Sequence, residues 1–252
     1  MTATARRAEA AQDALPGAAG GGVGREGGSV LAWDLPTRLA KWALAVLVGL
    51  AFASKYYGDL ELVWHMWNGL AILVVVVFRV LWGFVGGSTA RFTRFLADPL
   101  RAIGYLVALL RGRAPRFLGH NPLGGWMVVA LLAAVAAQAV TGLFTTDDII
   151  VDGPLVRVAS EETVASASGL HQRIYWVMLA LVAVHIVVNI GYSLVGKDNL
   201  IRAMLTGRKP RAVYADQPAA TAGSIVKALA CLAVSLLVVF GGIALAGGDP
   251  FP

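Results

Sequence analysis

Residues 170–194 read LHQRIYWVMLALVAVHIVVNIGYSL, an almost wholly apolar stretch that carries two imidazoles, at His171 and His185. A helix that spans a bilayer needs about 20 mostly apolar residues, and this stretch is long enough. Ionisable side chains are costly inside a membrane, so those that occur there usually have a function. The segment therefore predicts a membrane-spanning helix that positions two functional histidines.

The whole chain has the composition of a polytopic membrane protein. Of its 252 residues, 58% are hydrophobic and 14% are charged, and the mean hydropathy is +0.70, values outside the range of soluble domains. We predict an all-α fold with five membrane spans. The predicted spans are residues 39–57, 62–84, 123–144, 174–196 and 228–247.

The segments outside the spans give fewer indications of structure and function, and no internal repeat is apparent in the sequence. Residues 1–30 are rich in alanine and glycine and predict a disordered cytoplasmic tail, because no apolar run follows Arg6 and Arg7 as a signal peptide requires. The single cysteine, Cys231, excludes an internal disulfide and a four-cysteine iron–sulfur site. We divide the rest into a membrane domain at 31–210, a linker at 211–223, and a spanning helix with a short outer tail at 224–252.

Lysine and arginine in short loops predict which way the chain crosses the membrane. The loop after the second span and the segment after the fourth are basic, so we expect both to be cytoplasmic. The acidic loop before the fourth span is then outside, the N-terminus inside and the C-terminus outside. The net charge of +6 thus reflects topology and gives no reason to propose nucleic-acid binding. The residues are Arg91, Arg94, Arg101, Arg111, Arg113, Arg116, Lys197, Arg202, Arg208, Lys209 and Arg211, and the acidic Asp147, Asp148, Asp152, Glu161 and Glu162.

Within the basic loop after the second span, residues 97–113 predict a short helix. Asp98 suits the N-cap and Pro99 the first helical position. The uncharged stretch between Arg101 and Arg111 is too short to cross the bilayer, so we expect this helix to lie along the inner interface.

The histidines fall at two predicted depths in the membrane. His185 follows His171 by 14 residues (185 − 171), so both rings project from nearly one helix face, about 21 Å apart along the axis. His65 lies at the outer start of the second span, at the same depth as His171. Two imidazoles that face each other from two helices are what a six-coordinate haem iron needs as axial ligands. We therefore predict an outer haem site between His65 and His171.

Each histidine also has a simpler interpretation. Taken singly, His65 and His171 fit polar residues at the membrane interface. His185 fits an imidazole bonded to a backbone carbonyl or a hydroxyl group. The shared depth of the first two, with His185 on the same face as His171, favours the haem interpretation.

Other residues at these depths support a haem site or have a structural role. Gly69, one turn after His65, leaves room for a porphyrin. Arg79 lies 14 residues after His65 (79 − 65) and either binds the propionates of an inner haem or anchors the inner end. His120, in an Asn-Pro turn before the third span, is either structural or a propionate ligand. Interhelical hydrogen bonds are expected from Gln138 and Thr141.

A series of short motifs follows along the chain: WDLPTRLAKW (33–42), LWGFVG (81–86), RGRAPRFLGHNPLGGWM (111–127), GLFTTDD (142–148), KDNL (197–200) and MLTGRK (204–209). In sequence and order they resemble the bacterial cytochrome b561 family, which includes the b-type cytochrome subunits of nickel–iron hydrogenases. The resemblance covers Trp33 to Lys209 and leaves out the fifth span. It implies a four-helix haem-binding bundle in a bacterial inner membrane. The fifth span adds one extra C-terminal transmembrane helix to that bundle.

The resemblance also implies two b haems, one near each membrane face. It assigns His65 and His171 to the outer haem iron and His185 to the inner one. The second inner ligand of the family is the histidine of a Phe-His pair, where this chain has Ala40-Lys41. Lysine binds iron only as the neutral amine, and we expect Lys41 to stay charged at the inner interface. The inner site should therefore be empty or weakly occupied. Ligation by Lys41 or His120 is the alternative.

The predicted function is electron transfer. An iron with two histidine ligands has no open coordination position, which favours one-electron transfer over oxygen chemistry. We predict a membrane subunit that links the quinone pool to a periplasmic redox partner, such as a c-type cytochrome, a hydrogenase or a molybdoenzyme. With the outer haem alone, about 15 Å of hydrocarbon separates the iron from the inner side, so quinol exchange is expected in the outer half.

Two other classes of function are alternatives. A transporter would use the histidines as proton or metal relays, and it predicts acidic residues beside them, which the predicted spans lack. A cofactor-free membrane anchor predicts no absorbance change on reduction.

Overall fold

The computed structural model describes residues 28–57, 62–194 and 198–251. Most of the predicted N-terminal tail, residues 1–27, lies outside them. Within the described residues, five helices are long and apolar enough to cross a membrane, as predicted. They are α2 (Leu35–Tyr57), α3 (Val63–Val85), α6 (Pro122–Gly142), α7 (Glu161–Leu194) and the continuous helix formed by α9 (Ile225–Leu236), the π-helical segment η2 (Leu237–Gly241) and α10 (Gly242–Leu245).

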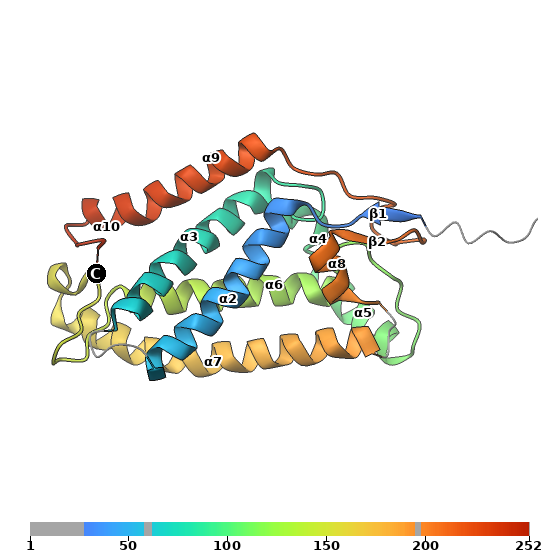
Figure 1. The fold of residues 1–252 in the computed structure, drawn as a ribbon. Coiled ribbons are helices and arrows are strands. Elements are labelled where there is room, and N and C mark those ends of the chain that lie inside the picture. The colour runs from blue at the N-terminus through green and yellow to red at the C-terminus, as the bar shows by residue number, and fades with distance from the viewer. Residues whose placement is uncertain (1–27, 58–61, 195–197, 252) are drawn as a thin grey trace, which may run out of the picture.

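The five helices alternate in direction and lie side by side (Figure 1). α2 packs along α3, α6 packs along α7, and α3 joins the two pairs through α6. α9 lies on the other side of α3. We call the end where α3 and α7 begin the outer end and the end where they finish the inner end, after the orientation that the charges predict.

α3 is the central helix of the bundle. In its most apolar stretch 44% of the residues are buried, against 6% in the corresponding stretch of α7. Leu70, Leu73 and Val74 of α3 pack with Val135 of α6 and Met178 of α7. Most apolar side chains of α7 therefore face outward, as expected of a helix surrounded largely by lipid.

α7 begins earlier than predicted. We expected the span to start near residue 174, with His171 at its beginning, but the helix starts at Glu161, ten residues before His171 (171 − 161). Ser160 caps this helix by accepting the N–H of Thr163 at 3.3 Å, and Glu161 and Glu162 lie in the first turn, where carboxylates are favourable. His171 is therefore flanked by regular helix on both sides.

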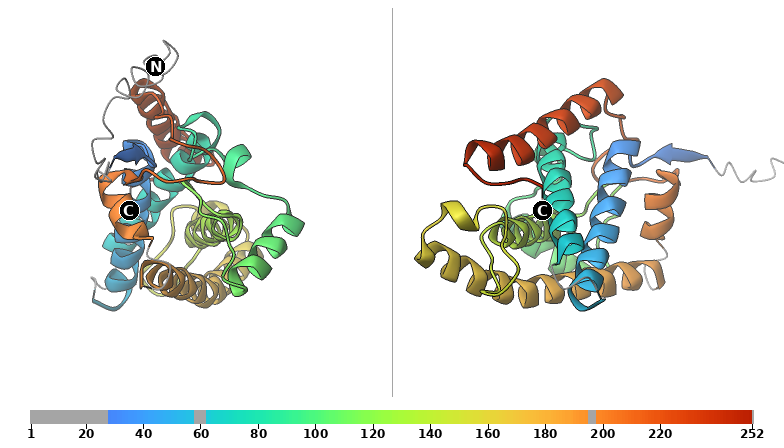
Figure 2. Two further views of the ribbon diagram at one scale, coloured as in Figure 1. Left: turned by 90° about the vertical axis from the view of Figure 1, so that its right-hand side faces the viewer. Right: turned by 60° about the vertical axis from the view of Figure 1, so that its left-hand side comes forward.

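The short helix predicted in the basic loop is confirmed as α5 (Pro99–Leu110). Asp98 accepts the N–H of Arg101 at 3.0 Å, and Pro99 occupies the first turn. α5 follows the single turn α4 (Phe92–Phe95), packs against α6 and lies to the side of the long helices (Figure 2). Leu100 and Leu110 are exposed, as an interfacial helix would require.

The all-α prediction missed a small sheet at the inner end. β1 (Ser29–Leu31) pairs antiparallel with β2 (Arg208–Pro210), with Ser29 opposite Pro210. The predicted boundary of the tail at residue 30 is therefore wrong, because β1 begins before it. Strands of three residues that pair across most of the chain leave no periodic pattern in the sequence, which explains the error.

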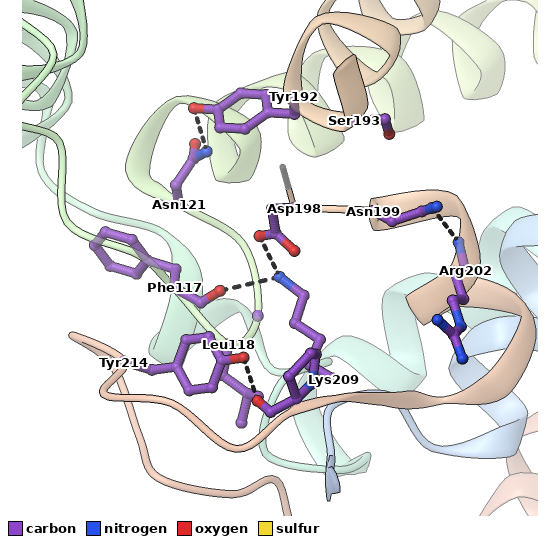
Figure 3. A network of polar contacts seen from close by, with 12 residues as sticks. Phe117, Leu118, Asn121, Tyr192, Ser193, Asp198, Asn199, Arg202, Lys209 and Tyr214 are labelled. Carbon is purple, nitrogen blue, oxygen red and sulfur yellow. Dashed lines mark hydrogen bonds and ion pairs between the residues drawn. The ribbon is translucent and has the colours of Figure 1, made fainter. Parts of the chain in front are cut away.

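An ion pair with a buried lysine lies at the inner end beside this sheet. Lys209 is 2% exposed, and its amine lies 2.8 Å from Asp198 Oδ2 and donates to the carbonyl of Phe117 at 3.1 Å (Figure 3). The neighbouring helix α8 (Leu200–Thr206) is capped by Asn199. The charge of Lys209, which we had counted as one of the basic residues at the inner surface, is thus neutralised locally.

The predicted linker, 211–223, is fastened to the bundle by hydrogen bonds. The carboxylate of Asp216 accepts the N–H groups of Leu118 and Gly119 at 2.7 and 2.9 Å. Asp34 Oδ2 accepts the N–H of Gly223 at 3.0 Å, next to the start of α9. The fifth spanning helix is therefore tied to the rest of the protein at its inner end.

Candidate functional site

α3 and α7 bring two of the predicted site residues together at the outer end. The ring centroids of His65 and His171 are 6.4 Å apart, and the ring planes are nearly perpendicular, at 83°. Two imidazoles that bind one metal ion from opposite sides, through nitrogens about 2 Å from the metal, have ring centres about 6 Å apart. The separation in this structure therefore fits a shared metal ion.

Both rings are held through Nδ1 by a backbone carbonyl of the neighbouring helix. Nδ1 of His65 lies 3.0 Å from the carbonyl oxygen of Ala51 in α2, and Nδ1 of His171 lies 2.9 Å from that of Gln138 in α6. A carbonyl oxygen only accepts, so Nδ1 carries the proton in each ring, and Nε2 of the neutral imidazole keeps its lone pair. Metal-binding histidines in proteins are usually oriented by such a bond.

The same support occurs in both helical hairpins. Ser54 lies three residues after Ala51 (54 − 51) and places its hydroxyl oxygen 3.3 Å from Nδ1 of His65. Thr141 lies three residues after Gln138 (141 − 138), with its hydroxyl oxygen 3.2 Å from Nδ1 of His171. The pairs α2–α3 and α6–α7 thus each present one histidine with one carbonyl and one hydroxyl behind it.

These supporting groups were only partly anticipated. Thr141 was expected to bond between helices, and its hydroxyl does contact His171 of α7. Gln138 contacts His171 through its backbone carbonyl, whereas its side-chain oxygen Oε1 has no hydrogen-bond partner among the described residues. Ser54 was missed, although it follows the uninterrupted apolar run 42–53 and is therefore conspicuous in the sequence. The carbonyl of Ala51 has no side-chain signal, so sequence inspection does not reveal it.

Two glycines shape the space around the histidine pair. At Gly69, one turn from His65 on the same helix, a Cβ atom would meet no heavy atom within 4 Å, so this face is open. A Cβ atom at Gly142 would lie 3.1 Å from Cε1 of the His171 ring, so a side chain there would crowd the imidazole. Two nitrogen donors and an open helix face fit a haem, whose porphyrin supplies the other four ligands of iron.

The predicted inner residues do not form a second pair of histidines. The amine of Lys41 lies 3.2 Å from Nε2 of His120 and 3.8 Å from the centre of the Trp33 ring. The side-chain amide of Asn189 lies 3.3 Å from both ring nitrogens of His185. Lys41 does reach toward the inner end, as expected, but its amine is enclosed by two rings instead of lying in the interface.

The surroundings of His120 disfavour the charged form of its ring. Burial, together with the nearby charge of Lys41, lowers the pKa of His120 well below its usual range. Nε2 therefore accepts a hydrogen bond from the Lys41 amine, and the proton of the ring is on Nδ1. That Nδ1 atom is buried and has no hydrogen-bond partner among the described residues.

Arg79 lies on α3 in the inner half of the bundle and is only 2% exposed. Its guanidinium carbon lies 5.4 Å from the ring centre of Phe92 and 6.0 Å from that of Phe95. Neither terminal nitrogen has a hydrogen-bond partner in the part of the chain that the structure describes. Such burial contradicts the interpretation of Arg79 as an interfacial anchor.

A family model and a relative of known description both match most of this chain. A family model described as prokaryotic cytochrome b561 matches residues 32–207, which contain α2, α3, α6 and α7 and end before α9. A protein of Rhizobium leguminosarum bv. viciae, described as a probable Ni/Fe-hydrogenase B-type cytochrome subunit, is 23% identical over 216 residues. That alignment covers 72% of this chain and 89% of the relative.

Proposed function

This chain belongs to the prokaryotic cytochrome b561 family, and we propose that it carries electrons through one b-type haem held between His65 and His171 at the outer end. Family membership and the five apolar helices make it a multi-pass bacterial membrane protein and a b-type cytochrome. When bound, a haem with two histidine ligands supplies one-electron chemistry without an open coordination position.

The observation that supports this proposal best is the tautomer that the two imidazoles share. Because each Nδ1–H donates to a carbonyl, neither ring has a proton on Nε2 to offer the other. Two lone pairs from rings 6.4 Å apart are then available to one electron-pair acceptor. A haem iron held by the two rings would supply that acceptor.

The surrounding residues would set the properties of this site. The carbonyls of Ala51 and Gln138 fix the ring tautomers and make the imidazoles more basic, which favours the oxidised iron and lowers its reduction potential. The hydroxyls of Ser54 and Thr141 hold the same carbonyls and so limit rotation of both rings.

We propose further that the inner haem site of the family is altered in this chain. Lys41 stands where the family has a histidine, and its amine is engaged by His120 and Trp33. The side-chain amide of Asn189 lies 3.3 Å from both ring nitrogens of His185. One firmly held haem, with quinol exchange in the outer half of the membrane, follows from this arrangement.

The outer loop before α7 is suited to a partner with a basic surface. Asp147 Oδ1 accepts the N–H groups of Ile149, Ile150 and Val151 at 3.0, 2.9 and 2.8 Å. These bonds hold the pKa of Asp147 below its usual range, so the loop keeps its negative charge in mildly acidic surroundings. We propose a c-type cytochrome, a hydrogenase or a molybdoenzyme as the partner, and the name of the Rhizobium relative adds weight to a hydrogenase.

Electron exchange with quinol and with a basic protein tests this function. Oxidised protein in liposomes is mixed with a short-chain quinol, and the absorption bands of reduced haem are expected to appear. A basic c-type cytochrome added outside should then reoxidise the haem, at a rate that falls steeply with ionic strength. Reduction by dithionite but not by quinol would reject the quinone role, and liposomes that contain His65→Ala are the control.

A further inference from the structure

The terminal nitrogens of Arg79 make no hydrogen bond or ion pair with the described residues. Its side chain is 98% buried (100 − 2) and both terminal nitrogens lack hydrogen-bond partners within the described residues. An unpaired charge in an apolar interior is strongly unfavourable. The two phenylalanine rings against the guanidinium offer it cation–π contacts but no acceptor for its N–H groups.

Two further nitrogen donors lie beside this arginine. The ring of Phe95 contacts both Arg79, at 6.0 Å, and His120, at 4.7 Å between ring centres. The Lys41 amine lies 3.2 Å from the other side of the His120 ring, at Nε2. Groups from α2, α3 and the turn before α6 therefore gather at one place, where Nδ1–H of His120 is also without a partner.

The carboxylates of Asp34 and Asp198 do not accept hydrogen bonds from these donors. Asp34 is 5% exposed, but Oδ1 accepts the N–H of Thr37 at 3.1 Å, and Oδ2 accepts those of Gly87 and Gly223 at 3.2 and 3.0 Å. The carboxylate of Asp198 is paired with Lys209. The terminal N–H groups of Arg79 and Nδ1–H of His120 are therefore donors that no acceptor among the described residues uses.

We propose that Arg79, with Lys41 and Nδ1–H of His120, forms a binding site for an oxyanion, either a carboxylate or a phosphate group. A guanidinium presents two parallel N–H groups that match the oxygens of both. Two sources of such a group are available in a membrane protein of this family. One is the phosphate of an anionic phospholipid, and the other is a propionate of a porphyrin in the inner half.

The sign of a stability change tests whether the site is occupied. Methionine is unbranched like the aliphatic part of arginine and carries no charge. If nothing binds, Arg79→Met removes an unpaired buried charge and leaves the thermal midpoint unchanged or raised. If an oxyanion is bound, the substitution leaves that anion unpaired, and we expect the midpoint in mild detergent to fall by several degrees. An unchanged or higher midpoint would overturn the proposal.

Two further measurements on the same samples identify the occupant. Native mass spectrometry is expected to show loss of a bound anionic phospholipid in Arg79→Met if the group is a lipid phosphate. Pyridine haemochrome analysis shows loss of one haem per chain if it is a propionate. Either loss supports the site, and a variant with the same bound lipid and haem as the wild type contradicts it. Arg101→Met is the matched control, because the Arg101 side chain is 81% exposed.

If Arg79→Met cannot be purified, measurements on the wild-type protein test whether the site binds an oxyanion. Delipidated wild-type protein should be stabilised by phosphate more than by chloride at equal ionic strength, and re-addition of an anionic phospholipid should have the same effect. A wild type that releases no anionic phospholipid on denaturation, holds no second haem and gains no stability from phosphate would overturn the proposal.

Discussion

Replacing His65 with alanine is expected to leave the purified protein almost without haem. The substitution removes one of the two imidazoles whose ring centroids lie 6.4 Å apart at the proposed haem site. Loss of a residue that only orients a metal ligand already weakens metal binding by about 10–100-fold, so loss of the ligand itself should reduce haem content by at least about tenfold. The measurement is the haem-to-protein ratio, with the reduced-minus-oxidised spectrum.

The control variants separate loss of a ligand from loss of the fold. His185→Ala changes a histidine on α7 that the proposal does not assign to the outer iron, so its haem content should match the wild type. Ser54→Ala removes a supporting hydroxyl and should retain haem with a modest shift of its reduction potential. A His65→Ala protein that keeps the haem content and spectrum of the wild type would show that His65 is no ligand.

Replacing Lys41 with histidine is expected to add a second haem to each chain. The substitution supplies the imidazole that the family resemblance implies at this position, and it removes the amine that now engages His120. A second imidazole would then be available in the inner half together with His185. Pyridine haemochrome analysis should show the haem content per chain doubling, and a redox titration should change from one component to two.

Lys41→Gln is the matched control, because it removes the same charge without supplying an iron ligand. It should leave the haem content unchanged. A wild-type protein that already holds two haems would refute the altered inner site. A Lys41→His protein with unchanged haem content would show that Lys41 is not the residue that prevents haem binding there.

The spanning helices were predictable because their signal is simple. A run of apolar residues long enough to cross a bilayer leaves few alternatives, and all five predicted spans coincide with helices. The start of α7 was placed too late because the segment before His171 is polar, although its alanines and glutamates favour a helix. The sheet β1–β2 was missed because its pairing depends on contacts between distant parts of the chain.

The approach of His65 to His171 was also predictable, from alternating helix direction and helical periodicity alone. The groups that hold the two rings in place were less predictable. Two of the acceptors are backbone carbonyls, of Ala51 and Gln138, and any residue type supplies a carbonyl. The isolation of Arg79 belongs to the same class, because it depends on which groups fail to reach it in three dimensions.

The most direct test is the identity of the two axial ligands in the wild-type protein. Near-infrared magnetic circular dichroism of the oxidised protein, with electron paramagnetic resonance of the same sample, reports the ligands and the spin state of the iron. The account predicts a low-spin ferric haem with two imidazole ligands. A high-spin iron, a lysine amine or a sulfur ligand in place of one imidazole, or the absence of haem from protein purified from a haem-replete host, would contradict it.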